Sequence, residues 1–231
     1  YHFTGIKSMR CIIFLFIVSL TFGQWSSFQL SSLKDVNKES RTLFRYGGLM
    51  ATNQPLLEIN GKKRIALGGS LNKGLSNSGI IPLIHGQIKV SWNLTFRGRM
   101  ASYSAKEGAV QLYGWGFSLR PGKQEALSKW IILFDAGNLT SYNQFQLTAI
   151  QSMGVHSVLW KNIPTHIGFG INIINPNQYA LTDNEIIVKS KIQSNFIYVG
   201  TTFNLFGFKT IPQLWAGSDY NLISISIVDT F

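Results

Sequence analysis

The stretch of sequence that decides the fold covers residues 88–100 and reads IKVSWNLTFRGRM. Its even-numbered positions carry mainly large apolar side chains, whereas its odd-numbered positions carry cationic or polar ones. Successive side chains of a β-strand point to opposite faces of a sheet. The stretch therefore predicts a strand over 86–101 that has one apolar face and one polar, cationic face.

The same alternation recurs along the chain after residue 40, with turn-forming residues between the alternating segments. For example, Ile167, Phe169 and Ile171 alternate with two glycines. The pattern predicts eight strands, near residues 43–51, 64–72, 86–101, 109–120, 128–138, 143–158, 164–174 and 219–231. One or two further strands are expected within 185–215, and no helix of consequence is expected after residue 40.

The composition leaves the chain little charge with which to cover a water-facing surface. Of its 231 residues, 13% are charged and 45% are hydrophobic, whereas a soluble domain has about 25% charged residues. The formal net charge of +11 comes from basic residues scattered along the chain. No run or motif typical of nucleic-acid binding accompanies them. We therefore expect no nucleic-acid partner.

The lengths of the predicted strands favour a membrane barrel. Several exceed the five or six residues usual in soluble sheets and match the roughly 9–11 residues that cross a bilayer at a tilt. Because every backbone polar group within a bilayer must be paired, spanning strands have to close into a barrel. We predict an all-β fold, an antiparallel up-and-down transmembrane β-barrel of about 8–10 strands, with ten favoured. Trp130, Trp160 and Trp215 are expected near its membrane interfaces.

The beginning of the chain has the pattern of a secretory signal peptide. Two basic residues precede an apolar run over 12–22, which is too short to span a membrane as a helix. We predict that residues 1–23 comprise upstream residues and a cleaved signal peptide that starts at Met9. The remainder, 24–231, is expected to form a single β-barrel domain. Cys11 would be removed with the signal peptide, so no disulfide is expected in the mature chain.

The last strand of the chain alternates once more. Its apolar face consists of Ile223, Ile225, Ile227 and Phe231, and small hydroxyl side chains occupy the other face. The arrangement resembles the closing strand of bacterial outer-membrane β-barrel proteins, although Asp229 stands where an apolar residue is common. The resemblance implies a small bacterial outer-membrane barrel in contact with outer-membrane lipid. It also implies that the barrel-assembly machinery recognises this strand, and that both chain ends lie in the periplasm.

A set of basic side chains is expected inside the barrel. If the polar face of the quoted stretch points inward, the lumen acquires a cationic stripe made of Arg45, Lys89, Arg97 and Arg99. Buried cations need partners, and Asp135 is the best candidate among the few acidic residues. Such a stripe would attract anions in an open lumen, or belong to a hydrogen-bonded plug in a filled one.

The sequence contains no motif that predicts catalysis, a cofactor or a metal site. His156 lies near Ser152 and Ser157, but neighbouring positions face opposite sides and no third group completes a catalytic triad. We therefore expect a non-enzymatic outer-membrane barrel with a structural or binding role and no catalytic residue, cofactor or metal.

Three alternatives stay open at this point. The first is a narrow anion-preferring channel. The second is a lipid-modifying barrel enzyme, which would need a lumenal His–Ser or acid pair near the outer rim. The third is a secreted soluble β-sandwich or lipocalin-like binder, whose apolar strand faces would point inward. The sequence does not indicate the ligand or the oligomeric state.

Overall fold

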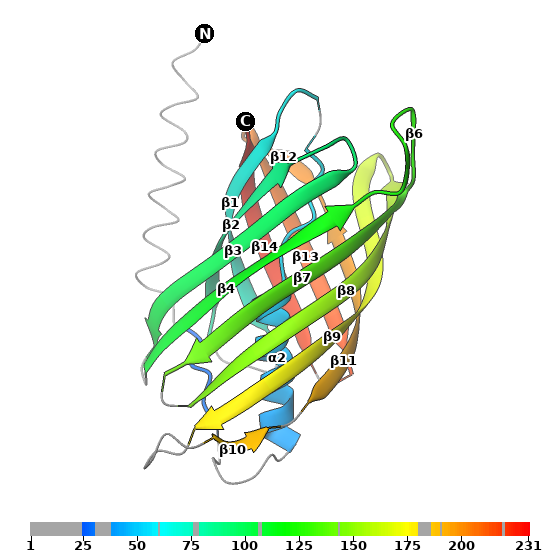
Figure 1. Ribbon diagram of the computed structural model, residues 1–231. Coiled ribbons are helices and arrows are strands. Elements are labelled where there is room, and N and C mark those ends of the chain that lie inside the picture. Colours follow the sequence, from blue (N-terminus) through cyan, green and yellow to red (C-terminus); the bar gives the residue numbers. More distant parts are fainter. Residues whose placement is uncertain are drawn as a thin grey trace.

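The computed structural model describes residues 25–30, 38–59, 61–75, 79–105, 108–142, 144–179, 186–189, 191–218 and 220–231. The predicted signal peptide, with Met9 and Cys11, lies outside these residues. Figure 1 shows the described part of the chain as a ring of long tilted strands around one helix. None of the helices found in this part is long and apolar enough to span a membrane.

Ten strands of the described residues form the wall of the barrel. They are β1 (Ile65–Gly74), β2 (Ile81–Lys89), β3 (Leu94–Ala105), β4 (Gly108–Leu119), β7 (Trp130–Ser141), β8 (Phe145–Trp160), β9 (Ile163–Tyr179), β11 (Ile192–Thr201), β13 (Phe208–Gly217) and β14 (Asn221–Thr230). The short strands outside the wall are β5 (Gly122–Lys123), β6 (Ala126–Leu127), β10 (Ile186–Lys189) and β12 (Phe203–Leu205).

The wall closes on itself without a free edge. Each wall strand pairs antiparallel with the next one along the chain, and β1 pairs with β14 from Ala66↔Thr230 to Gly74↔Leu222. Closure pairs the backbone groups that an open sheet would leave at its edges. The prediction of an all-β, antiparallel up-and-down barrel with ten strands is confirmed.

The single strand predicted over 86–101 is wrong, because the stretch contains a hairpin. β2 ends at Lys89 and β3 begins at Leu94, with a tight turn in which the Val90 amide donates to the Leu94 carbonyl at 3.0 Å. Ile88 pairs with Phe96, so even-numbered residues face even-numbered ones across the hairpin. The alternation therefore continues in phase through the turn, which is why the sequence hid it.

The strand predicted over 43–51 is also wrong, and so is the absence of helix after residue 40. These residues belong to α2 (Lys38–Thr52), which lies inside the barrel and contacts β4, β7, β8, β9 and β11 (Figure 1). Phe44, Leu49 and Met50 are each 0% exposed. The charged residues Lys38, Glu39 and Arg41 stand in the exposed first turns of α2, whereas its second half is buried. That half contains Gly47 and Gly48, and glycine disfavours a helix interior, which is why the sequence did not indicate a helix.

The chain crosses the lumen before the wall begins. At the end of the barrel opposite Phe231, the Trp25 backbone forms a bridge with Ile80, and the Ser141 hydroxyl donates to the Phe28 carbonyl at 2.9 Å. From there α2 enters the lumen, and residues 53–59 continue to the end that holds Phe231. We call residues 38–59 the plug and this second end the C-terminal end. The described chain thus has Trp25 and Phe231 at opposite ends, whereas both chain ends were expected on one side.

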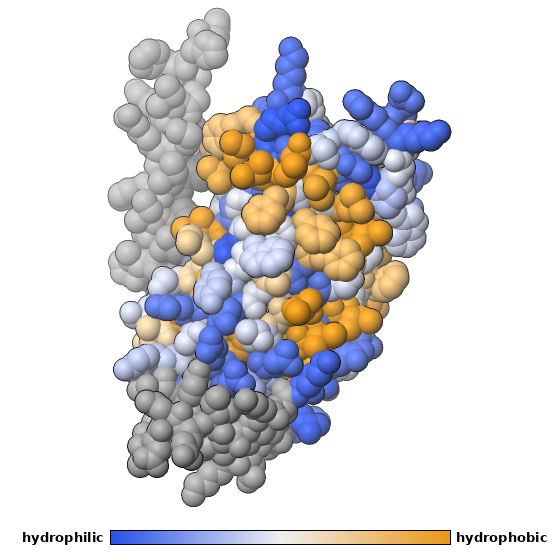
Figure 2. All heavy atoms as spheres, viewed as in Figure 1, coloured by the Kyte–Doolittle hydropathy of each residue, from blue (hydrophilic) through white to orange (hydrophobic). Residues whose placement is uncertain are grey.

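The outer surface of the wall is apolar. Leu67, Ile84, Met100, Trp115 and Phe169 come from five different strands, and each is between 54% and 66% exposed. Figure 2 shows hydrophobic side chains gathered over the barrel wall, with hydrophilic ones concentrated toward its two rims. The wall therefore presents to its surroundings the kind of surface that a soluble monomer buries.

The inner surface of the wall has two zones, one apolar and one polar. Around α2, the wall turns apolar side chains inward, among them Leu147 and Val155 of β8, so His156 points outward instead of into the lumen. Trp215, expected at a membrane interface, is 1% exposed and packs inside the barrel against Tyr198. Beyond the C-terminal end of α2 the inner wall becomes polar.

Candidate functional site

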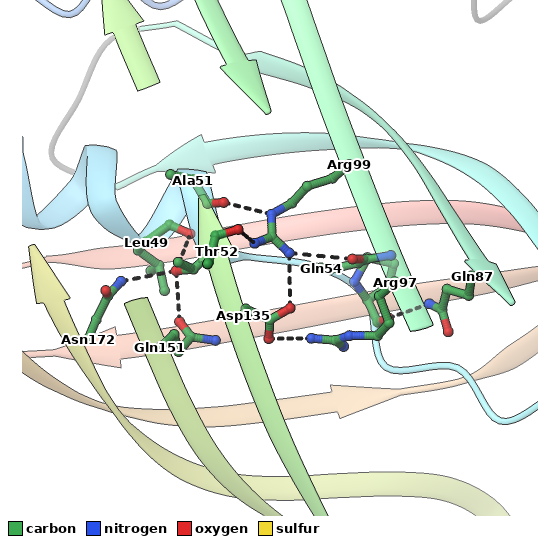
Figure 3. A network of polar contacts seen from close by, with 12 residues as sticks. Leu49, Ala51, Thr52, Gln54, Gln87, Arg97, Arg99, Asp135, Gln151 and Asn172 are labelled. Carbon is green, nitrogen blue, oxygen red and sulfur yellow. Dashed lines mark hydrogen bonds and ion pairs between the residues drawn. The ribbon is translucent and has the colours of Figure 1, made fainter. Parts of the chain in front are cut away.

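The most elaborate polar site of the described residues joins the last turn of α2 to the barrel wall (Figure 3). At its centre is Arg99 of β3, which is buried. Its Nε donates to the carbonyl oxygen of Ala51 at 2.6 Å, and its Nη1 lies 3.1 Å from Oδ1 of Asp135 on β7. Its Nη2 donates to the carbonyl of Ala136 at 3.2 Å. One guanidinium thus ties the plug to two wall strands.

A second buried arginine shares the same carboxylate. Nη2 of Arg97 forms an ion pair with Oδ2 of Asp135, and both side chains are at most 1% exposed. Two guanidinium charges therefore face one carboxylate. The carbonyl groups at the C-terminal end of a helix carry partial negative charge, so the contact between Arg99 and Ala51 offsets part of the excess positive charge.

Thr52, the last residue of α2, is bound by the two wall strands that follow β7. Its hydroxyl donates to Oε1 of Gln151 at 2.9 Å, and it accepts from Nδ2 of Asn172 at 3.0 Å. Gln151 lies on β8 and Asn172 on β9, at positions that pair directly across the two strands. Gln151 also pairs directly with Asp135, so the end of α2 is bound to a continuous band of polar side chains on β7, β8 and β9.

The extended half of the plug is also bound along its length. Nδ2 of Asn53 donates to Oδ1 of Asn72 at 3.0 Å, and Nε2 of Gln54 donates to the Gly86 carbonyl at 3.0 Å. Gln87 returns a bond from the wall, since its Nε2 donates to the Pro55 carbonyl at 2.8 Å. Polar groups that the plug brings into the lumen thus find partners on β1 and β2, as burial requires.

At the C-terminal end the plug is held by charged residues of the rim. Glu58 forms an ion pair with Arg120, and its carbonyl accepts from Nζ of Lys209 at 3.1 Å. Nζ of Lys89 donates to the Ile59 carbonyl at 3.0 Å. The plug is therefore bound at the helix end, along its extended segment and at the rim.

Close packing of α2 against the wall depends on two glycines. A Cβ on Gly48 would lie 2.4 Å from Cγ1 of Ile174, which is too near the branch point of that side chain to move away easily. A Cβ on Gly137 of β7 would lie 2.0 Å from the Ala51 carbonyl oxygen. Any larger residue at either position would push α2 away from the wall.

The structure places the four residues of the predicted cationic stripe at different levels of the lumen. Arg97 and Arg99 lie together on β3, but Lys89 lies at the rim and Arg45 on α2, not on a wall strand. Sequence reasoning missed the plug side of the site, because the binding groups there are Thr52, Gln54 and a backbone carbonyl. Only the position of α2 brings these groups to the arginines.

One histidine–serine pair lies at the C-terminal end. Ser157 and His166 pair directly across β8 and β9, and the Ser157 hydroxyl lies 3.0 Å from Nδ1 of His166. The Glu58 carboxylate accepts from Ser157 at 3.5 Å, so the acid lies on the serine side of the pair and not on the far side of the imidazole ring. A catalytic triad needs the acid to orient the histidine, and this arrangement lacks that geometry.

Among the described residues, no group of His, Cys, Asp and Glu side chains could hold a metal ion. His85 lies within β2 and points into the lumen, where it is 3% exposed. The polar site is thus built from structural hydrogen bonds and ion pairs between the plug and the wall.

Comparison with known proteins relates the chain to solved barrels at low sequence identity. The translocator domain of autotransporter NalP from Neisseria meningitidis aligns with 74% of this chain and 89% of its own, at a TM-score of 0.41 and 10% identity. The KdgM porin aligns with 72% of this chain and 99% of its own, at a TM-score of 0.35 and 6% identity. Ail, the attachment invasion locus protein of Yersinia pestis, aligns with 74% of this chain and 98% of its own, at a TM-score of 0.25 and 10% identity.

No protein-family model and no curated protein matches the chain. The structural likenesses concern the fold alone, and the closed wall is established by the strand pairing of this chain itself. At the level of the fold, the expected closed antiparallel β-barrel is confirmed.

Proposed function

We propose that this protein spans a bacterial outer membrane as a barrel that its own plug keeps closed, and that it acts as a structural or binding scaffold. The observation that carries this proposal is the attachment of the plug to the wall at Ala51, Thr52, Gln54 and Glu58. A segment held by so many contacts leaves the lumen filled. The surfaces available for binding are then the two rims.

The membrane setting is supported by the outer surface. Side chains such as Ile84 and Phe169 are 66% and 64% exposed, and similar residues surround the wall. A lipocalin-like soluble barrel would turn these faces inward, whereas here the lumen contains the buried arginines and the plug. Contact with lipid is the simplest way to remove this much apolar surface from water.

The filled lumen weighs against the anion-channel alternative. Arg97 and Arg99 are engaged by Asp135 and by the Ala51 carbonyl, so they do not line an open passage. The Ser157–His166 pair lacks an orienting acid, which weighs against the enzyme alternative. The scaffold role requires neither conductance nor catalysis.

Two measurements on the full chain test the proposal. The first is electrophoretic mobility with and without boiling, on protein from the outer-membrane fraction. We expect a heat-dependent shift in that fraction. Recovery in the soluble periplasm without a shift would refute the membrane setting.

The second measurement is conductance in planar bilayers. We expect no steady current from the wild type, because the plug fills the lumen. Gly48→Leu should give open events, since the new side chain would collide with Ile174 and displace α2. Gly98→Leu is the matched control, because a Cβ on Gly98 meets no atom within 4 Å. A steady anion-selective current through the wild type, lost in the double variant Arg97→Gln and Arg99→Gln, would establish the channel instead.

A further inference from the structure

The C-terminal end of the barrel contains a cavity that the plug and the wall form together. Its volume is about 870 Å³, within the range of roughly 300–1,000 Å³ typical of small-molecule sites. Glu58 of the plug lines one side, and the ends of β8, β9 and β13 line the other. Lys129 and Asn204, which also line it, are exposed, so a ligand can reach the cavity from outside the barrel.

The charged side chains of the cavity are predominantly basic. Arg120, Lys129 and Lys209 line it, and the acidic residue of its lining is Glu58. Arg120 neutralises that carboxylate in an ion pair. Lys209 donates to a backbone carbonyl, but an ammonium carries more than one N–H donor. The two lysines therefore leave the cavity with positive charge that no carboxylate of its lining balances.

Hydroxyl groups and apolar side chains complete the lining. Ser128 and Thr202 offer hydroxyl donors beside the cationic groups. Leu57, Val158 and Pro164 provide an apolar surface in the same cavity. A group that carries both a negative charge and a short apolar part matches this combination, because cations and hydroxyls bind oxyanions while the apolar side chains cover the remainder.

We propose that this cavity binds an organic oxyanion, a phosphate or carboxylate joined to a short apolar group. Lys129 and Lys209 hold the oxyanion, and the surface formed by Leu57 and Val158 covers the apolar part. The site is distinct from the attachment of α2, which lies deeper in the lumen. Binding would therefore occur in a closed barrel and does not depend on any current through it.

The test uses the full chain folded in a non-ionic detergent, with its heat-dependent mobility shift as the check on folding. Calorimetric titration compares hexyl phosphate, inorganic phosphate and hexanol. We expect saturable binding of hexyl phosphate, weaker binding of inorganic phosphate and no binding of hexanol. Absence of saturable hexyl phosphate binding, or equal binding of hexanol, would overturn the proposal.

Variants locate the binding to the cavity. The double substitution Lys129→Gln and Lys209→Gln should weaken hexyl phosphate binding about tenfold or more, because charge-assisted contacts become neutral ones. Lys161→Gln is the matched control, since Lys161 lies at the same end over the Trp160 ring and does not line the cavity. Thr202→Phe, which places a bulky ring in the cavity and keeps both lysines, should also weaken binding. Wild-type affinity in these cavity variants would overturn the assignment.

Mass spectrometry of lipid extracted from the membrane-purified protein distinguishes two sources of the oxyanion. A tightly bound phospholipid that is present in the wild type and lost in the double lysine variant identifies a lipid headgroup. A lipid-free wild type that binds hexyl phosphate identifies a free small molecule. Both outcomes support the proposed chemistry, whereas lipid retained equally by both proteins, without hexyl phosphate binding, contradicts it.

Discussion

Asp135 connects two buried arginines at the centre of the lumen. Both guanidinium groups contact its carboxylate, and all three side chains are at most 1% exposed. A buried ion pair contributes little net stability compared with an apolar replacement, but removing one partner leaves a buried charge without compensation. The carboxylate of Asp135 is therefore the group on which the polar zone of the lumen depends most.

Asp135→Asn should lower the free energy of unfolding by about 3–5 kcal/mol, because the substitution leaves Arg97 and Arg99 without a counter-charge. Urea unfolding of the barrel in lipid vesicles, followed by tryptophan fluorescence, measures the change. Glu125→Gln is the control, since Glu125 is an exposed acid at the rim. Equal unfolding midpoints for Asp135→Asn and the wild type would show that the carboxylate is not needed to hold the arginines.

Strand β14 and helix α2 show what the sequence can and cannot predict at the scale of elements. The faces of β14 follow from alternation, because the outer surface of the barrel lies on one side and the lumen on the other. The structure keeps Ile223, Ile225 and Phe231 exposed at 41%, 52% and 61%. Helix α2 has apolar and polar side chains at helical spacing, but Gly47 and Gly48 in its buried half lower its helix propensity.

The polar contacts inside the lumen could likewise be predicted only in part. The pairing of Arg97 and Arg99 with Asp135 could be suggested from charge alone, because acids are scarce in the chain. The carbonyl of Ala51 could not, since a backbone group has no sequence signature. The inward apolar face of β8 could not be predicted either, because it packs against α2, which the sequence did not indicate.

Phe231→Ala should reduce the amount of folded barrel, if the assembly machinery recognises the apolar face of β14 as we propose. The heat-shifted fraction of the protein in isolated outer membranes measures the effect. Phe206→Ala is the matched control, because Phe206 is 77% exposed in a turn and lies outside β14. Normal assembly of Phe231→Ala would show that recognition does not depend on this aromatic ring.

For the whole molecule, the apolar belt should make the barrel sensitive to charge at mid-depth. Phe169→Lys, in the middle of β9, should destabilise the folded protein by about 2–4 kcal/mol in a bilayer, and Leu205→Lys, at the rim, by about 1 kcal/mol or less. Urea unfolding of both variants in lipid vesicles makes the comparison. Equal costs at the two positions would mean that the belt does not face hydrocarbon.

The plug precedes every wall strand in the chain, yet it ends up inside the ring that those strands form. Neighbouring strands pair through local hairpins, whereas β1 and β14 come from the two extremes of the wall and bear the largest loop-closure entropy. Their pairing should therefore come last, after α2 has gathered the wall around Phe44, Leu49 and Met50. In that order of events the helix acts as a template. Its diameter then helps to set the circumference at which β1 and β14 can pair.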